Sequence, residues 1–201
     1  GTGKHGRILA SKGYTVHGIE QSEEMVQKTI QGNGFTCQQG DIRNVKMNKK
    51  YDAVLSLFHV MSYQTSNSSL QAVFKRASEH LRLGGVFLFD FWYTPAVYAQ
   101  RPLVRVKRLA DDFIEITRIA EPELHPNENC VDVNYTIYAR DLKTGMVQTM
   151  SEKHPMRHFT IPEIDLLASI NGFERVHAEE FLTGRPASEE AWGVCVTLKR
   201  I

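Results

Sequence analysis

The fold of this chain is decided by Gly1-Thr-Gly-Lys-His-Gly6 and by the strand-like run that follows it, Tyr14-Thr-Val-His-Gly-Ile-Glu20. A glycine-rich turn that opens a helix lets backbone N–H groups approach a ligand closely, because glycine has no Cβ. An acidic residue at the end of the next strand can bind both hydroxyls of a ribose. The turn and Glu20 together therefore predict a nucleoside-binding site. The sequence begins inside this motif, so we expect roughly 30 or more residues upstream of Gly1, enough for a strand and a covering helix.

Helical and strand patterns alternate through the first half of the chain. Helices are expected at residues 6–12, 23–30 and 70–81, and strands at 14–20, 35–39, 51–58 and 86–91. The run from Tyr51 to Phe58 is almost continuously apolar, which is typical of a strand covered on both faces. This alternation predicts an α/β fold with a doubly wound, mostly parallel sheet.

The alternation is interrupted between residues 101 and 153, where apolar and polar residues alternate singly, as in Val131-Asp-Val-Asn-Tyr135. This pattern favours an antiparallel β insert with one covered face. A capping box, Thr160-Ile-Pro-Glu163, then starts a helix that ends near Ile170, and two closing strands follow. We therefore expect a main domain at residues 1–100 and 154–201 and an insert at residues 101–153 that covers an acceptor site.

Charge and composition exclude several classes of partner. A formal net charge of +1 provides no field that would attract nucleic acid or an anionic membrane. No stretch approaches the roughly 20 apolar residues of a spanning helix, so we expect a cytoplasmic protein. Cys37, Cys130 and Cys195 lie far apart, without metal-ligand spacing, and are expected to be buried, reduced thiols. No metal site is predicted.

Two classes of nucleotide-binding protein compete for the glycine turn. A dinucleotide-dependent dehydrogenase needs a further catalytic pair such as Tyr-x-x-x-Lys, and none is visible. A second acid, Asp41 in Gly40-Asp41, follows the strand at residues 35–39, where it can contact an adenine amino group. Two acids at neighbouring strand ends favour a ligand whose adenosine lies across those ends.

With these motifs in this order, the chain resembles the class I S-adenosylmethionine-dependent methyltransferases. Further matching segments are Tyr51-Asp-Ala-Val-Leu-Ser-Leu and Leu83-Gly-Gly-Val-Phe-Leu-Phe-Asp. The resemblance implies a seven-stranded Rossmann-like sheet whose last strand is antiparallel, and S-adenosyl-L-methionine as cofactor. The cofactor-binding residues that it implies are Gly1, Thr2, Gly3, Glu20, Gln21, Asp41, Ile42 and Phe58.

A narrower resemblance is carried by Phe58-His-Val-Met-Ser-Tyr63, Phe91-Trp-Tyr-Thr-Pro95, the antiparallel insert and Trp192-Gly-Val. These segments are similar to deoxysugar-nucleotide N,N-dimethyltransferases. The resemblance implies a small-molecule acceptor, an amine on a nucleotide-linked sugar.

The chemistry of methyl transfer to an amine indicates the candidate catalytic residues. The amine must be neutral to attack, so a nearby proton acceptor is favoured. His59 and Tyr63 follow a strand at the carboxyl edge, where open α/β sheets bind ligands. His59 is the better candidate, and packing against the cofactor is its alternative role.

The expected substrate-binding residues are Trp92, Tyr93 and Arg105. The two aromatic side chains can form a wall beside a cation. Arg105 belongs to the basic run between Arg101 and Arg108, which suits a diphosphate or forms a solvated strand face. For His154 and His158, surface or core packing is the expected role.

We therefore expect a metal-independent methyltransferase that acts on the amine of a small molecule. O-methylation of a small metabolite or sugar stays open, as does a non-catalytic, cofactor-binding partner subunit. A homodimer also stays open.

Overall fold

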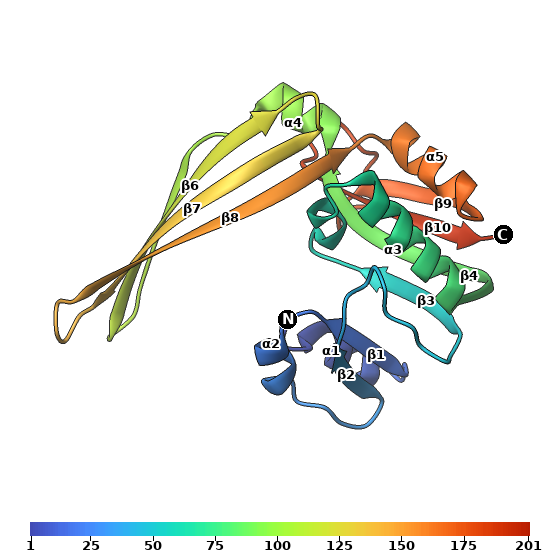
Figure 1. Cartoon of the computed structure of the whole chain (residues 1–201), viewed down its shortest axis with the longest axis horizontal. Coiled ribbons are helices and arrows are strands. Elements are labelled where there is room, and N and C mark those ends of the chain that lie inside the picture. Colours follow the sequence, from blue (N-terminus) through green and yellow to red (C-terminus); the bar gives the residue numbers. More distant parts are fainter. The chain divides into compact units, whose positions relative to one another are not determined.

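The computed structural model describes residues 1–201 and consists of two units, residues 1–49 and residues 50–201. Each unit has its own sheet, with two strands in the first and eight in the second. Figure 1 shows the order of the elements along the chain.

The first unit pairs two short parallel strands with two helices. Its elements are α1 (Lys4–Ser11), β1 (Val16–Glu20), α2 (Glu23–Gln27) and β2 (Phe35–Gln39). Strand β1 is parallel to β2, with Glu20 opposite Gln39. Helix α2 begins at Ser22, whose hydroxyl accepts a hydrogen bond from the N–H of Met25 at 3.3 Å. The two strands end at the same edge, and the Gly40 N–H donates to the Glu20 carbonyl there at 2.9 Å.

Packing of α1 depends on two of the glycines in the loop. Gly3 has φ +75°, a left-handed conformation that favours glycine. A Cβ on Gly3 would lie 2.6 Å from the ring of Phe35, and a Cβ on Gly6 would also collide with that ring. The Phe35 side chain is buried. Gly3 and Gly6 therefore let the helix start lie directly on β2, whereas Gly1 has open space around it.

The second unit begins with alternating strands and helices and ends with a hairpin. Its elements outside the insert are β3 (Tyr51–Ser56), the 3-10 helix η1 (Val60–Tyr63), α3 (Asn67–His80), β4 (Leu81–Tyr93), α4 (Thr94–Gln100), α5 (Ile161–Ile170), β9 (Phe173–Glu180) and β10 (Gly193–Arg200). Strand β3 is parallel to β4, whereas β10 is antiparallel to both β4 and β9.

An aromatic core joins α3 to this sheet. Phe74 of α3 is fully buried and lies edge-on to Phe87 and Phe89 of β4, with ring centroids 5.7 Å apart in each pair. Its ring also meets Phe173 of β9 at 6.3 Å. Burying each of these side chains stabilises the unit by about 1.5–3 kcal/mol. The core therefore fixes the position of β4, whose carboxyl end carries site residues.

The insert is a four-stranded antiparallel sheet that extends as an arm (Figure 1). Its strands are β5 (Arg105–Ala110), β6 (Ile114–His125), β7 (Cys130–Asp141) and β8 (Val147–Phe159). The end of β8 joins the main sheet, because Trp92 and Tyr93 of β4 pair in parallel with His158 and Phe159. At this end, Val131, Val133 and Met156 pack against Val97 of α4 and the two tryptophans.

The predicted α/β class and antiparallel insertion are confirmed, and the sheet is mixed. The strands are grouped differently from the seven expected, because β8 continues into the main sheet while β1 and β2 pair only with each other. Helix α4 was not expected, although Pro95 in its first turn is a helix-start signal. Thr160 caps α5, accepting the Glu163 N–H at 3.3 Å, but the Glu163 carboxylate binds Arg157 at 2.6 Å and leaves the capping box half formed.

All three cysteines are free thiols. Cys130 and Cys195 are buried as expected, and burial raises the pKa of Cys195 to about 11. The expectation for Cys37 was wrong, because its side chain is only half-buried on the short β2. No helix of the structure is long and apolar enough to cross a membrane.

Candidate active site

The first unit brings two acids to the carboxyl edge of its parallel strands. Glu20 ends β1, and one oxygen of its carboxylate accepts the Ser22 N–H at 2.9 Å. The side chain of Glu20 is therefore held at the start of α2. This is the position from which a carboxylate can accept hydrogen bonds from a diol.

Asp41 follows β2 at the same edge, but its carboxylate is already engaged. Arg43 donates to both oxygens, at distances of 2.5–2.9 Å, and this hydrogen bonding lowers the pKa of Asp41. Gln21 accepts from the Gln39 side-chain amide at 3.2 Å and so ties the two strand ends together. The predicted cofactor residues of this unit thus lie along one loop edge: Gly1, Thr2, Gly3, Glu20, Gln21, Asp41 and Ile42.

The second unit places His59 against a buried carboxylate. Phe58 and His59 follow β3 with φ values of 64° and 63°, a left-handed pair that costs about 1–3 kcal/mol per residue. The loop is held because Asp90 of β4 accepts the His59 backbone N–H at 2.9 Å. The same carboxylate oxygen lies 2.8 Å from Nδ1 of His59.

The carboxylate of Asp90 is buried and only partly hydrogen-bonded. Its side chain is fully buried, and its other oxygen, Oδ1, has no hydrogen-bond partner. Burying a carboxylate is costly unless a cation or several donors compensate it. His59, one third exposed, is the side chain that lies beside this carboxylate.

The Trp92 ring is the aromatic group next to this histidine. The Trp92 ring lies 6.3 Å from the His59 ring, and the Trp192 ring lies 5.6 Å from Trp92. The predicted cofactor residue Phe58 is half exposed and lies edge-on to Phe181 at 5.9 Å. Tyr93 precedes α4, and its N–H donates to the Trp192 carbonyl at 3.0 Å.

Tyr63 is held by the insert. Its hydroxyl lies 2.9 Å from Nδ1 of His154 on β8, and Nε2 of His154 lies 3.1 Å from the Glu152 carboxylate. The Tyr135 ring of β7 meets the His154 ring edge-on at 5.2 Å. Burial, with the neighbouring Tyr135 and Glu152, raises the pKa of Tyr63. His158, by contrast, is fully buried, and desolvation lowers its pKa to about 4, which fits the expected packing role.

A basic cluster lies on the same face of the insert as Tyr135. Lys107 of β5 is opposite Arg118 of β6, whose guanidinium stacks over the Tyr135 ring at 4.9 Å. Arg105 lies on this face too, opposite Ala120. Like charges directly opposite destabilise a sheet. None of these three cations belongs to an ion pair of the structure, so the cluster suits an anionic ligand.

The structure thus gathers His59, Tyr63, Trp92 and Tyr93 around η1 and the end of β4, while Arg105 lies farther along the insert. The sequence did not indicate Glu152, Tyr135 and Arg118 as site residues, and it indicated only a packing role for His154. Glu152 and His154 are two residues apart on a strand, a spacing that puts both on one face. Their partner Tyr63 is distant in sequence, and only the fold brings it to them.

Comparisons with known proteins show that the chain is similar to methyltransferases. Residues 1–85 match the family model described as a methyltransferase domain. The dTDP-3-amino-3,4,6-trideoxy-alpha-D-glucopyranose N,N-dimethyltransferase of Streptomyces venezuelae is 27% identical over 188 residues, which cover 93% of this chain and 76% of the relative. The dTDP-3-amino-3,6-dideoxy-alpha-D-glucopyranose N,N-dimethyltransferase of Streptomyces fradiae is 23% identical, with coverages of 93% and 71%.

The fold is similar to that of a solved S-adenosylmethionine-dependent methyltransferase from Clostridium acetobutylicum. The TM-score is 0.82 at 20% sequence identity, with 100% of this chain and 80% of the solved chain covered.

Proposed function

We propose that this chain, an S-adenosylmethionine-dependent methyltransferase, transfers methyl groups to the amino group of a nucleotide-linked amino sugar. The observation that supports an amine as the methyl acceptor is the pairing of His59 with the buried Asp90. The observation that supports a nucleotide-linked sugar is the uncompensated basic cluster of Arg105, Lys107 and Arg118 on the insert.

The first unit provides the residues that fit the cofactor. Glu20 would bind the ribose hydroxyls, and Asp41 with Ile42 would bind the adenine. The open backbone of the glycine loop, unobstructed at Gly1, would face the amino-acid end. When bound, S-adenosylmethionine supplies a methyl carbon that is already electrophilic, so the protein contributes mainly alignment.

Residue His59 is proposed to act as the proton acceptor for the amine. An amino sugar arrives mostly as an ammonium, which has no lone pair for attack. Nδ1 of His59 lies 2.8 Å from the Asp90 carboxylate, so Nε2 is the ring nitrogen proposed to face the acceptor. The imidazolium that forms is stabilised by the buried carboxylate, in the manner of an orienting acid in a catalytic dyad. Trp92 and Tyr93 would line the acceptor side, and a ring face there favours the cation.

A continuous series of contacts leads from the basic cluster to the loop after β3. Arg118 stacks on Tyr135, Tyr135 meets His154, and His154 hydrogen-bonds Tyr63. A diphosphate at Lys107 and Arg118 would therefore place an attached sugar toward η1. Arginine and lysine are the usual partners of such phosphates. We propose that the insert, residues 101–153, covers the acceptor in this way.

The acceptor is tested with isotope-labelled S-adenosylmethionine and three acceptors. These are a dTDP-linked amino sugar, the free amino sugar, and a dTDP-linked sugar without an amine. We expect label on nitrogen of the first, and a kcat/KM about tenfold lower for the free sugar. Lys107→Ala should raise KM for the dTDP-linked acceptor about fivefold to tenfold, with kcat unchanged, because a charge-assisted contact is lost.

The matched control is Lys143→Ala, which removes the same charge from the exposed β7–β8 turn. Label on a sugar hydroxyl would make the chain an O-methyltransferase. Equal kcat/KM for free and dTDP-linked amino sugars would contradict a nucleotide-binding role for the cluster.

We further propose that the far end of the insert pairs with a second copy of the chain. On the face that carries Tyr135, the residues beyond Arg118 are almost all apolar: Leu109, Ile116, Ile137, Ala139 and Met150. Leu109 is 53% and Met150 46% exposed, although the near end of the same face is covered by α4. A two-fold dimer brings one such face onto its own copy, which is self-complementary.

Light scattering of the full chain tests this dimer. We expect a dimer for the unaltered chain and a monomer for Leu109→Glu, because a buried charge opposes association. Val106→Glu is the control, since Val106 lies on the same strand with 50% exposure but on the opposite face. A monomeric unaltered chain, or equal effects of the two variants, would contradict the pairing.

A further inference from the structure

The hydrogen-bonded series Tyr63–His154–Glu152 has a fixed direction. A carboxylate only accepts hydrogen bonds, so Nε2 of His154, 3.1 Å from Glu152, must carry the ring proton. In the neutral imidazole Nδ1 is then an acceptor, and the Tyr63 hydroxyl donates to it at 2.9 Å. The Tyr63 hydroxyl therefore donates its proton in the hydrogen bond to His154, and the lone pairs of its oxygen can accept a hydrogen bond from another group.

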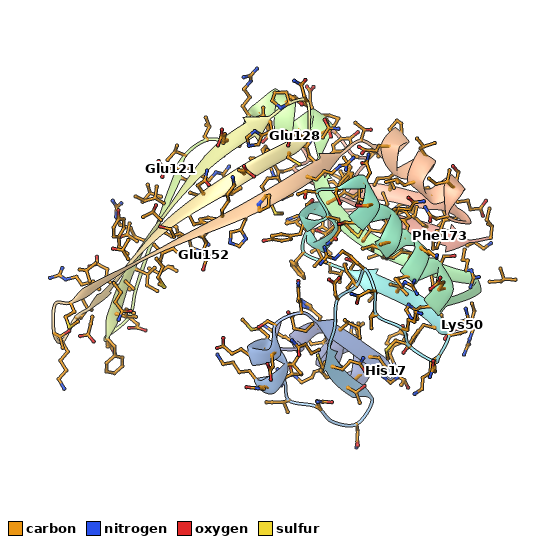
Figure 2. The ribbon with its side chains drawn as sticks, viewed as in Figure 1. His17, Lys50, Glu121, Glu128, Glu152 and Phe173 are labelled. Atoms are coloured by element: carbon orange, nitrogen blue, oxygen red, sulfur yellow. The ribbon has the colours of Figure 1, made fainter.

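The surroundings keep this series in place. Glu152 and His154 lie two residues apart on one face of β8, and Figure 2 shows Glu152 on that strand within the insert. Tyr135 packs against the His154 ring. Glu152 is half exposed, whereas the Asp90 carboxylate beside His59 is fully buried. The series thus ends in solvent, and the dyad of His59 and Asp90 ends inside the protein.

We propose that Tyr63, with His154 and Glu152 behind it, is a second proton acceptor for the amine, used for the second of two methyl transfers. This inference rests on the proposed methylation of an amine. Tyr63 touches the acceptor nitrogen, and His154 and Glu152 are positioning residues that act through it.

The proton count shows what a second acceptor would do. An ammonium loses one proton, the neutral amine attacks the methyl carbon, the carbon–sulfur bond breaks, and a methylammonium results. A second transfer requires that this methylammonium lose another proton. In this scheme His59 takes the first proton. The second passes to the Tyr63 oxygen while the Tyr63 proton moves to Nδ1 of His154, and the imidazolium pairs with Glu152.

The raised pKa of Tyr63 suits this role. A phenol that keeps its proton near neutral pH relays protons without itself becoming an anion. Its hydroxyl stays bonded to His154 between transfers.

Product analysis by mass spectrometry separates the two transfers. In Tyr63→Phe and His154→Gln we expect the second transfer to be slowed about tenfold more than the first, so that monomethyl product accumulates. The double variant should be no slower than either single one, because both changes interrupt one series. Residues with only a structural role would not change the ratio of monomethyl to dimethyl product.

The chain offers a matched control for this series. His177 and Glu179 of β9 form a second pair with the same spacing of 3.1 Å between Nε2 and the carboxylate, but no tyrosine hydroxyl joins them. His177→Gln and Glu179→Gln should leave the product ratio unchanged. The fluorescence of the two tryptophans, Trp92 and Trp192, checks that the second unit of every variant is folded.

An unchanged product ratio in Tyr63→Phe and His154→Gln would overturn the proposed role of Tyr63 as second proton acceptor. The proposed methylation of an amine would not be affected by that result. A readout independent of activity is NMR of the full chain with ¹⁵N-labelled histidine. We expect the neutral His154 ring to carry its proton on Nε2, and its resonances to shift in Tyr63→Phe. A ring proton on Nδ1 in the unaltered chain would overturn the proposed role of Tyr63, whether or not an acceptor is methylated. Absence of methyl transfer would contradict only the proposed function.

Discussion

Replacing His59 with glutamine is expected to lower kcat for amine methylation about 100-fold or more, because the acceptor then loses its first general base. Glutamine retains a polar side chain next to Asp90, so the loop after β3 keeps a hydrogen-bonding partner for the buried carboxylate. The Kd for S-adenosylmethionine should change less than about twofold, since alignment of the cofactor does not depend on proton transfer. Steady-state kinetics and calorimetry measure the two effects separately.

His125→Gln is a suitable control for this change. His125 also lies 2.8 Å from a carboxylate, that of Asp132, and it belongs to the same unit. Its substitution should leave kcat unaltered. Equal losses of turnover and cofactor affinity in His59→Gln would show that His59 is a packing residue, and an unaltered kcat would exclude it as a base.

Replacing Glu20 with alanine is expected to weaken S-adenosylmethionine binding by about 2 kcal/mol, or about 30-fold in Kd, because a charge-assisted hydrogen bond to the ribose is lost. Calorimetry of the full chain measures this loss. Part of it would come from the Ser22 N–H, which loses its acceptor at the start of α2. Glu20→Gln keeps an acceptor for Ser22 and removes only the charge, so it should weaken binding by a smaller factor.

Glu23→Ala is the matched control, because it removes one glutamate charge three residues farther along, in the first turn of α2. Its effect on Kd should be small. If Glu20→Ala bound the cofactor as tightly as the unaltered chain, Glu20 would not be a ribose ligand.

Periodic, local patterns were predictable from the sequence. The stripe of Leu70, Val73, Phe74 and Ala77 does form the buried side of α3, and strand β2 has the expected bounds at Phe35 and Gln39. The cap at Thr160 also formed as expected. These features depend on spacing within about ten residues, which the sequence displays directly.

Contacts between distant segments could not be predicted in the same way. Asp90 and His59 are 31 residues apart, and Tyr63 and His154 are 91 apart. Each pair depends on strand register and on where β8 joins β4. His154 was therefore expected to be a packing residue, although it links Tyr63 to Glu152. Helix α4 is only seven residues long, and its burial against the insert compensates for a weak local pattern.

The ring of Phe35 has a consequence for reading substitutions in the glycine loop. It occupies the space that a Cβ on Gly3 or Gly6 would need. The conformation of the loop and the stability of the first unit therefore depend on the same packing contacts. A larger residue at either position would displace α1 from β2 before any ligand is present. Lost cofactor binding in such variants would therefore report a disrupted first unit. A substitution of Gly1, where an added Cβ meets no atom within 4 Å, would test the contact with the cofactor without that disruption.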